Sequence, residues 1–237
     1  MSSSHLTRKD LKNDPLTHEV EVGAHYVADH RKLFTNVAIA IGVLLVGYGA
    51  YSYYSNSQAE KREVALFEAR RVMIATVGAT PAAGKGLHFN TVEERDKAVA
   101  DAYTKLAADY PGTAEGAIAK LYVAAAKADK GEIDGAVTDY RAVVSSAPAP
   151  FVSTAKLALG QILYSQGKVD EGRKLIQEVI DSPTEFVSSE HASLALARLL
   201  LKDKPEEARK LLDALAKSRS AVSTVAVELS AQLPRVN

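Results

Sequence analysis

A stretch of glycines around one lysine, VGATPAAGKGLHF from Val77 to Phe89, has the composition of a phosphate-binding loop. Such a loop needs the pattern G-x-x-x-x-G-K-[ST] between a strand and a helix, because its backbone N–H groups cradle phosphates and its hydroxyl binds magnesium. Here five residues separate Gly78 from Gly84, and Gly86 stands where the hydroxyl is needed. The residues before it have a helical pattern, so no strand is expected there. We interpret the stretch as a connection between helices.

The residue types of catalytic and metal sites are present but not grouped. More than a hundred residues separate His88 from His191, and His18, His25 and His30 lack the i, i+4 spacing of a helical metal site. There is no cysteine, which excludes disulfides, thiolate zinc sites and cysteine nucleophiles. The carboxylates alternate with lysine and arginine, as on solvated helix faces. We predict no catalytic residue, no metal, no cofactor and no small-molecule substrate; the chain is not expected to be an enzyme.

Composition narrows the class of partner. The 237 residues include 29 Lys and Arg against 29 Asp and Glu, so the formal net charge is zero. Nucleic-acid binding domains usually show a basic excess on one face, and this chain has none. Alanine, leucine and valine are abundant and tryptophan is absent. This composition favours close-packed helices, in an all-α fold.

One hydrophobic run is too long and too uniform for a soluble helix. Leu33 to Tyr54 holds 22 residues without a charge. As a helix it would be about 33 Å long, enough to cross a hydrocarbon core of about 30 Å. Tyrosines gather at its C-terminal end, as at a membrane interface. The 32 residues before it are too many for a cleaved signal peptide, so we predict a single uncleaved transmembrane helix.

Charges beside this run indicate its orientation. Arg31 and Lys32 precede it directly, whereas the first basic residue beyond it is Lys61. Basic residues favour the cytoplasmic side, although the bias here is modest. The predicted organisation is a cytoplasmic tail over 1–32, a transmembrane helix over 33–54 and an exported, periplasmic domain over 55–237.

Beyond residue 110 the sequence repeats with a period of 36. Three columns keep this spacing: Ala136, Gly172 and Ala208; Tyr140, Ile176 and Leu212; and Val143, Val179 and Leu215. A fixed period of this length is typical of stacked supersecondary units. Each unit has the pattern of a helix hairpin. The expected helices are Ala114–Ala128 with Ile133–Ser145, Phe151–Ser165 with Val169–Asp181, and Ser189–Leu201 with a helix that begins at Pro205.

Local signals explain where these helices end and how closely they pack. Gly131 and Gly167 provide left-handed C-terminal stops. Small residues in the first helix of each hairpin, Ala124, Gly160 and Ala197, face those of the second helix and permit close approach. Before the repeats, Lys97–Thr113 has the pattern of a second helix, with a capping box at Thr91 and Glu94 that marks its start. Ser57–Val77 would be its partner, and Ala221–Leu233 would cap the open end.

These columns resemble the tetratricopeptide repeat. The resemblance covers the small residue in helix A, the turn glycine, the small residue in helix B, an aromatic or aliphatic residue four positions later and a following proline. The period is 36 rather than the usual value of about 34, the third turn lacks glycine, and the tryptophan position is not filled. The implied fold is a right-handed solenoid of helical hairpins behind the N-terminal transmembrane helix.

The layout as a whole, with stretches such as AEGAIAKLYVAAAKADKGEIDGAVTDY, is similar to the YfgM-like ancillary subunit of the bacterial Sec translocon. That resemblance implies an inner-membrane protein that links exported chains to periplasmic chaperones and contacts translocon subunits. A scaffold for another envelope assembly, in outer-membrane biogenesis or division, remains as the alternative. The anchor is a membrane span and not a lipidated cysteine, which favours the first.

In such solenoids helix A lines the concave face, so its outward positions are the candidates for binding a protein partner. The expected groove residues are Leu121, Leu157, Gln161, Tyr164, Leu194 and Arg198, flanked by Ile118, Ala125, Thr154, His191 and Lys202. Tyr164 and Leu157 are the hypothesised contacts with a partner segment. Packing between helices is an equal alternative for several of these leucines. The Lys and Asn arrangement that clamps a peptide carboxylate in other tetratricopeptide domains is absent, which favours an adaptable, partly apolar groove.

Overall fold

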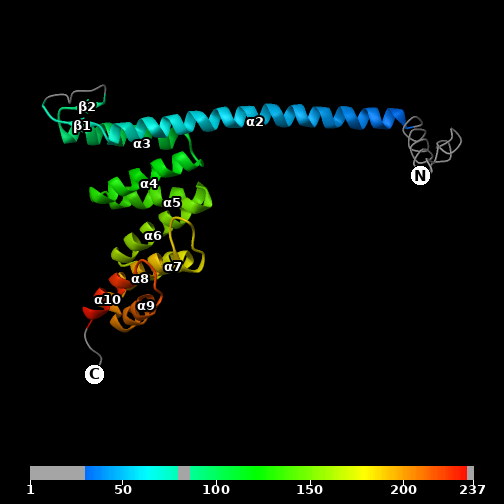
Figure 1. Cartoon of the computed structure of the whole chain (residues 1–237). Coiled ribbons are helices and arrows are strands. Elements are labelled where there is room, and N and C mark those ends of the chain that lie inside the picture. The colour runs from blue at the N-terminus through cyan, green and yellow to red at the C-terminus, as the bar shows by residue number, and fades with distance from the viewer. Residues whose placement is uncertain (1–29, 80–85, 234–237) are drawn as a thin grey trace, which may run out of the picture. The chain divides into compact units, whose positions relative to one another are not determined.

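The computed structural model describes residues 30–79 and 86–233, which are almost entirely helical (Figure 1). Two compact units divide the chain, Met1–Glu60 and Lys61–Asn237. The elements in chain order are α2 (Arg31–Met73), β1 (Thr76–Val77), β2 (His88–Phe89), α3 (Val92–Asp109), α4 (Ala114–Asp129), α5 (Ile133–Ser146), α6 (Ala149–Ser165), α7 (Val169–Asp181), α8 (Ser189–Asp203), α9 (Pro205–Lys217) and α10 (Ser223–Ala231). Residues 1–29 of the tail, with His18 and His25, lie outside the described residues, as do Gly84 and Lys85.

The apolar run Leu33 to Tyr54 lies inside α2, and almost all of its described side chains are exposed. Leu44 is 71% exposed, and none of the most apolar 18-residue window of the helix is buried. A core helix of a soluble protein would bury most of such a window. The helix is therefore long and apolar enough to cross a membrane, with apolar side chains on all faces. The exact limits of a span at residues 33 and 54 stay a prediction.

The unit Lys61–Asn237 is a stack of helix hairpins, as the 36-residue period predicts. α4 pairs with α5, α6 with α7 and α8 with α9, and each helix also contacts the next one along the chain. The first helices of successive hairpins touch as well, α4 with α6 and α6 with α8. The expected helix bounds are confirmed within two residues for these hairpins. α6 begins earlier than expected, at Ala149, because Pro150 is tolerated in a first turn.

Glycine ends the first helix of two hairpins in the expected way. Gly131 and Gly167 have φ values of 81° and 83°, in the left-handed region that favours glycine. After α6, the N–H of Gly167 bonds the carbonyl of Tyr164 and the N–H of Lys168 bonds that of Leu163, at 3.0 and 2.9 Å. These bonds satisfy carbonyls that the helix end leaves open. The third hairpin turns at Lys204 without a glycine.

Small residues hold the two helices of the middle hairpin close together. A Cβ atom on Gly160 would lie 2.9 Å from the carbonyl oxygen of Gly172 and 2.7 Å from Ile176 Cγ1. A Cβ on Gly172 would lie 2.5 Å from the carbonyl oxygen of Gly160. Ordinary van der Waals contact begins near 3.4 Å, so neither position admits a side chain without movement of the backbone. The predicted reason for small residues in these columns is confirmed here.

An additional hairpin precedes the three repeats. Leu66 and Ala69 of α2 share one apolar cluster with Tyr103 and Leu106 of α3. The Tyr103 ring stacks on Tyr122 of α4, with ring centroids 4.2 Å apart. The Thr91 hydroxyl accepts the N–H of Glu94 at 3.1 Å, and the Glu94 carboxylate accepts the N–H of Asn90 at 3.0 Å. The predicted capping box therefore starts α3, with the return bond one residue earlier than the usual pattern.

One expectation at the end of a helix is wrong. The helix expected to run to Val77 ends at Met73, and β1 then pairs in parallel with β2, Thr76 opposite His88. Threonine and valine are β-branched and favour the extended backbone. A short strand thus precedes the glycine stretch, contrary to our expectation, whereas the wrong glycine spacing and the missing hydroxyl still distinguish it from a phosphate loop. The last helix, Ser223–Ala231, lies within two residues of its expected bounds at both ends.

Buried tyrosines predict a loss of stability at alkaline pH. Tyr103, Tyr140 and Tyr164 are 2, 6 and 7% exposed, and burial raises the pKa of each phenol above its usual value. A folded-state pKa above the unfolded value means that stability is complete below about pH 10 and falls as pH rises through the folded pKa. We expect the urea midpoint, followed by circular dichroism, to stay level to about pH 9.5 and to fall above it. Replacing Tyr103 and Tyr140 by phenylalanine should flatten that fall; an equally steep fall would contradict this origin.

Candidate partner-binding face

Three of the six expected groove residues are core residues. Leu157, Tyr164 and Leu194 are 8, 7 and 6% exposed and belong to one apolar cluster of α6 to α10. The Tyr164 hydroxyl donates a hydrogen bond to Asp203 at 3.3 Å. Burial first, and then the Asp203 carboxylate, raises the pKa of Tyr164. Leu157 and Tyr164 are therefore mostly covered by the core, and direct contact of either side chain with a partner stays a prediction.

The other three expected residues reach the surface. Gln161 is half-buried, Arg198 is exposed, and Leu121 is half-buried against the core of the first hairpin. The division into buried and surface residues follows from helix geometry, because each residue adds about 100° of rotation. Leu157 and Tyr164 point to the flank that packs on the next hairpin, whereas Gln161 lies about 40° further round. A role for these residues in binding stays a prediction.

Gln161 lines an open groove of about 520 Å³ between α4 and α6. The lining residues are Ala128 of α4, Ile133 and Tyr140 of α5, Ala158, Gln161, Ile162 and Ser165 of α6, and Gln166 directly after α6. Its walls are mostly apolar, with amide and hydroxyl groups along the α6 side. A groove of this size admits a large apolar side chain. Sequence reasoning identified Gln161 alone, because the other walls come from two different hairpins.

The exposed positions of α4, α6 and α8 form what we name the A-helix face. The buried small residues Ala124, Gly160 and Ala197 mark one height in the three helices. Three outward positions share one side of each helix. They lie one residue after, five residues after and six residues before the small residue of that helix. They are Ala125, Asp129 and Ile118 on α4, Gln161, Ser165 and Thr154 on α6, and Arg198, Lys202 and His191 on α8, all exposed or half-exposed.

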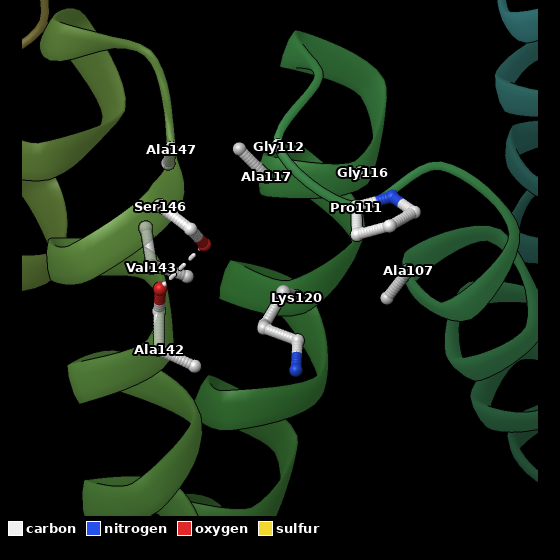
Figure 2. A pocket seen from close by; sticks show the side chains of 10 residues that line it. All are labelled: Ala107, Pro111, Gly112, Gly116, Ala117, Lys120, Ala142, Val143, Ser146 and Ala147. Carbon is white, nitrogen blue, oxygen red and sulfur yellow. Dashed lines mark hydrogen bonds between the residues drawn. The ribbon is translucent and has the colours of Figure 1, made fainter.

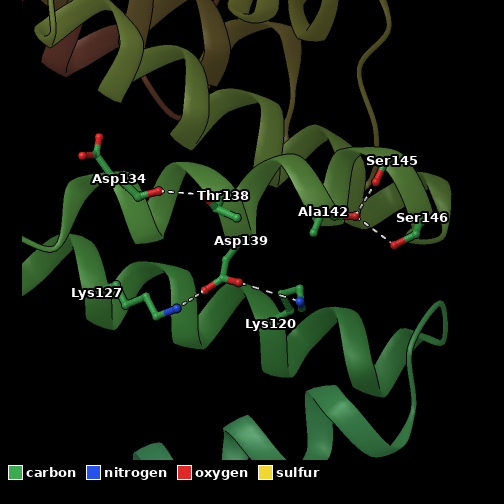
Figure 3. A network of polar contacts seen from close by, with 8 residues as sticks. All are labelled: Lys120, Lys127, Asp134, Thr138, Asp139, Ala142, Ser145 and Ser146. Atoms are coloured by element: carbon green, nitrogen blue, oxygen red, sulfur yellow. Dashed lines mark hydrogen bonds and ion pairs between the residues drawn. The ribbon is translucent and has the colours of Figure 1, made fainter.

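Ion pairs between neighbouring helices neutralise many other charges of the stack. Asp139 of α5 accepts the Lys127 ammonium at 2.7 Å and lies 3.7 Å from that of Lys120, both on α4 (Figure 3). Further pairs cross the later helices at 2.7 to 2.9 Å: Arg141 with Glu171, Lys156 with Glu178, and Arg173 with Glu207. These pairs are largely surface-exposed, so each contributes only a fraction of a kcal/mol. Their main effect is to leave little unbalanced charge on the helix surfaces that they join.

A cavity between α3, α4 and α5 is too small for most small-molecule ligands. It measures about 80 Å³ and is lined by ten residues, among which alanine and glycine predominate (Figure 2). Lys120 is the charged residue of this lining, and it already faces Asp139. Pockets for small molecules are several times larger and gather several polar groups. We interpret the cavity as a packing gap beside the close approach of α4 and α5.

The described residues hold no group of three or more His, Asp or Glu side chains that could bind a metal ion. His88 and His191 lie in separate elements: Thr76 contacts the ring of His88, while His191 is exposed on α8. The features of the unit Lys61–Asn237 that stand out are a groove and a row of outward side chains, which are features of protein binding. The function of this unit is therefore best sought in the surfaces that could bind another protein.

Comparison with known protein families assigns the helix hairpins to a family of repeats. The pattern described as a tetratricopeptide repeat-like domain matches residues 25–188, and that of a tetratricopeptide repeat matches residues 157–223. Repeat families of this kind are generally non-catalytic scaffolds that mediate protein–protein interactions. Comparison with characterised proteins and with solved structures gives no significant match.

The longer match covers more than half of the chain and begins ahead of the apolar part of α2. The shorter one adds α8 and α9, so both matches together include every hairpin that the 36-residue period predicts. The stacking order, the turn glycines and the small residues at the close approach agree with them. By this match the chain belongs to the tetratricopeptide repeat-like domain family.

Proposed function

We propose that the protein is a membrane-anchored adaptor that binds other proteins through its repeats. One observation carries this: a single family match runs from residue 25, through the apolar helix, into the helix hairpins. The exposed apolar part of α2 provides the anchor, and the A-helix face provides the binding surface.

The proposed location is the bacterial inner (cytoplasmic) membrane, crossed once, with the N-terminus in the cytoplasm and the repeats in the periplasm. The basic residues Arg31 and Lys32, directly before the apolar run, support this orientation. The proposed partners follow from the resemblance to the ancillary subunit of the Sec translocon. They are translocon subunits, exported chains and periplasmic chaperones, which the protein would link to one another. A scaffold in outer-membrane biogenesis or division is the alternative.

Site-specific photocrosslinking in intact membranes tests this function. The photoreactive residue belongs at Gln161, in the groove, because the side chain of Tyr164 is buried. Lys174, exposed on α7, is the matched control position. We expect mass spectrometry to identify translocon subunits, chaperones or exported chains from position 161 and not from position 174.

The other outcomes separate the alternatives. Capture of division or outer-membrane assembly proteins alone would assign the protein to another envelope scaffold. Capture of cytoplasmic proteins alone would reverse the proposed orientation. Equal capture from both positions would show that the groove is not the binding surface.

A further inference from the structure

The part of α2 that belongs to the hairpin stack carries an uncovered apolar stripe. Val64, Phe67 and Ile74 are 55, 61 and 79% exposed. Ile74 directly follows the helix, and its N–H still bonds the carbonyl of Arg70 at 3.1 Å, so the helical turn continues to it. Because each residue adds about 100° of rotation, the three side chains fall within an arc of about 80°. We name them the α2 stripe.

The opposite side of the same helix segment is part of the core. Leu66 and Ala69 are 8 and 4% exposed and share an apolar cluster with α3. A terminal repeat of such a stack ordinarily has a polar outer face, because no further repeat covers it. The α2 stripe departs from this rule. We therefore expect another molecule to cover it.

Lipid does not cover the stripe in the anchored protein proposed above. A helix rises 1.5 Å per residue, so Val64 lies about 15 Å of helix beyond Tyr54, where the apolar run ends. The polar layer on each side of a hydrocarbon core is only about 5–8 Å deep. The cover that this stripe requires is therefore a protein surface.

The membrane anchor favours a second copy of the chain as that protein. Every copy enters the bilayer through the same helix, in the same direction and to the same depth, so neighbouring copies present their stripes in parallel and at one height. Confinement to the membrane also raises the effective concentration of one copy for another. A two-fold axis then places Val64 and Phe67 against the same residues of the second copy, as in an isologous interface.

Charges beside the stripe agree with this arrangement. Lys61 and Glu68 flank it on one side, and Glu63 and Arg70 flank it on the other. A two-fold axis between parallel helices brings opposite flanks together, so Lys61 of one copy comes beside Glu63 of the other. In the same way Glu68 comes beside Arg70. Arg71, which lies within the stripe, is neutralised by Glu68 of its own helix at 2.9 Å and does not oppose the contact.

Two of these flanking charges have no counterpart in their own copy. Among the residues that the structure describes, no ion pair joins Lys61 or Glu63 to another side chain. The second copy supplies an opposite charge to each of them. Unlike charges along both edges of an apolar contact fix its register and disfavour other partners.

We infer that the protein forms a parallel homodimer through the α2 stripe, with apolar side chains at the centre and unlike charges along both edges. Each dimer carries two A-helix faces, so one assembly can hold a partner at two places. Such bivalent binding is tighter than binding to either face alone. The inference goes beyond the proposed adaptor function; it rests on the anchor of that function and not on its partners.

Disulfide crosslinking in isolated membranes tests the contact. The chain contains no cysteine, so one introduced cysteine is its only thiol. Val64→Cys and Phe67→Cys lie in the stripe, and Thr104→Cys, at an exposed site of α3, is the control. After oxidation with copper phenanthroline, we expect the stripe positions to form linked dimers at least about tenfold faster than the control, because a disulfide requires Cα atoms within about 7 Å.

A matched pair of substitutions tests the stripe without cysteine. Val64 and Val227 are both helical valines, 55 and 56% exposed, in the first and last helices of the stack. We expect Val64→Glu to raise the dimer dissociation constant at least about tenfold, because two like charges then meet in the contact. Val227→Glu should leave it unchanged. Light scattering of the full chain in uncharged detergent micelles measures the constant, and circular dichroism verifies that both variants are folded.

Several results would overturn the inference. These are a monomer at every concentration without a preferred disulfide, equally fast disulfide formation from Thr104→Cys, or equal effects of the two glutamates. Release of a different protein by Val64→Glu, with no second copy involved, would assign the stripe to that protein.

Carbonate extraction separates the failure of the dimer from the failure of the proposed anchor. A chain that stays in the membrane pellet but forms no linked dimer would reject the dimer alone. A chain that is extracted and still dimeric in light scattering would reject the anchor and leave the α2 contact in place.

Discussion

Arginine at both Leu44 and Leu45 is expected to remove the protein from the membrane. The two side chains are 71 and 66% exposed and lie near the middle of the apolar run. Each arginine at the centre of a spanning helix costs about 2.5–3.5 kcal/mol, so the pair costs about 5–7 kcal/mol. We expect the variant to leave the carbonate-resistant membrane pellet, in which the unaltered protein should remain.

Tyr53 and Tyr54 provide the control, because they end the same run and are also exposed. Arginines there can extend to the interface, so that variant should stay in the pellet. Circular dichroism and limited proteolysis of the repeats should agree between the two variants, which separates lost anchoring from unfolding. A double-arginine chain at Leu44 and Leu45 that resists carbonate extraction would contradict a membrane-spanning role for α2.

The second large expected effect is a loss of stability caused by one added methyl group. Gly172→Ala places a Cβ 2.5 Å from the carbonyl oxygen of Gly160 and 2.8 Å from the amide nitrogen of Tyr164. Both contacts are with backbone, so α6 and α7 have to separate. We expect a loss of about 3 kcal/mol of unfolding free energy. For a domain of this size that lowers Tm by roughly 6–12 °C, as measured by thermal unfolding of the full chain in detergent.

Gly135→Ala is the matched control, because it is also a glycine inside the second helix of a hairpin. Its new Cβ would lie 3.2 Å from Lys127 Cδ, which belongs to a flexible side chain that can move. Alanine favours the helix over glycine by about 1 kcal/mol, so this variant should be as stable as the unaltered protein or more so. Equal destabilisation by both substitutions would show that the close approach at Gly172 is not what limits side-chain size.

The hairpins were predictable because their signals are local and recur. Gly131, Gly167 and Pro205 mark helix ends and starts by backbone conformation alone, whatever the distant surroundings. The pairing of β1 with β2 was not predictable. A two-residue strand carries no periodic pattern, and its partner lies beyond a glycine-rich connection.

The candidate site was predictable only in part, for a geometric reason. A helical period tells which side of α6 is apolar, but α6 packs on α5, α7 and α8 at once. Leu157 and Gln161 are about 40° apart on this helix, and only the position of α8 determines that the first is buried. The groove has the same origin: Ile133 and Tyr140 belong to the preceding hairpin, and no spacing in the sequence connects them with Gln161.

The contact pattern of the stack also allows the chain to fold one hairpin at a time. In the unit Lys61–Asn237, the described helices pack on the next helix or on the next but one. Every hairpin can therefore dock as soon as the one before it is in place, without waiting for a distant segment. A chain released from its N-terminal end, as in synthesis, can thus build the core of its repeats progressively behind the point of emergence.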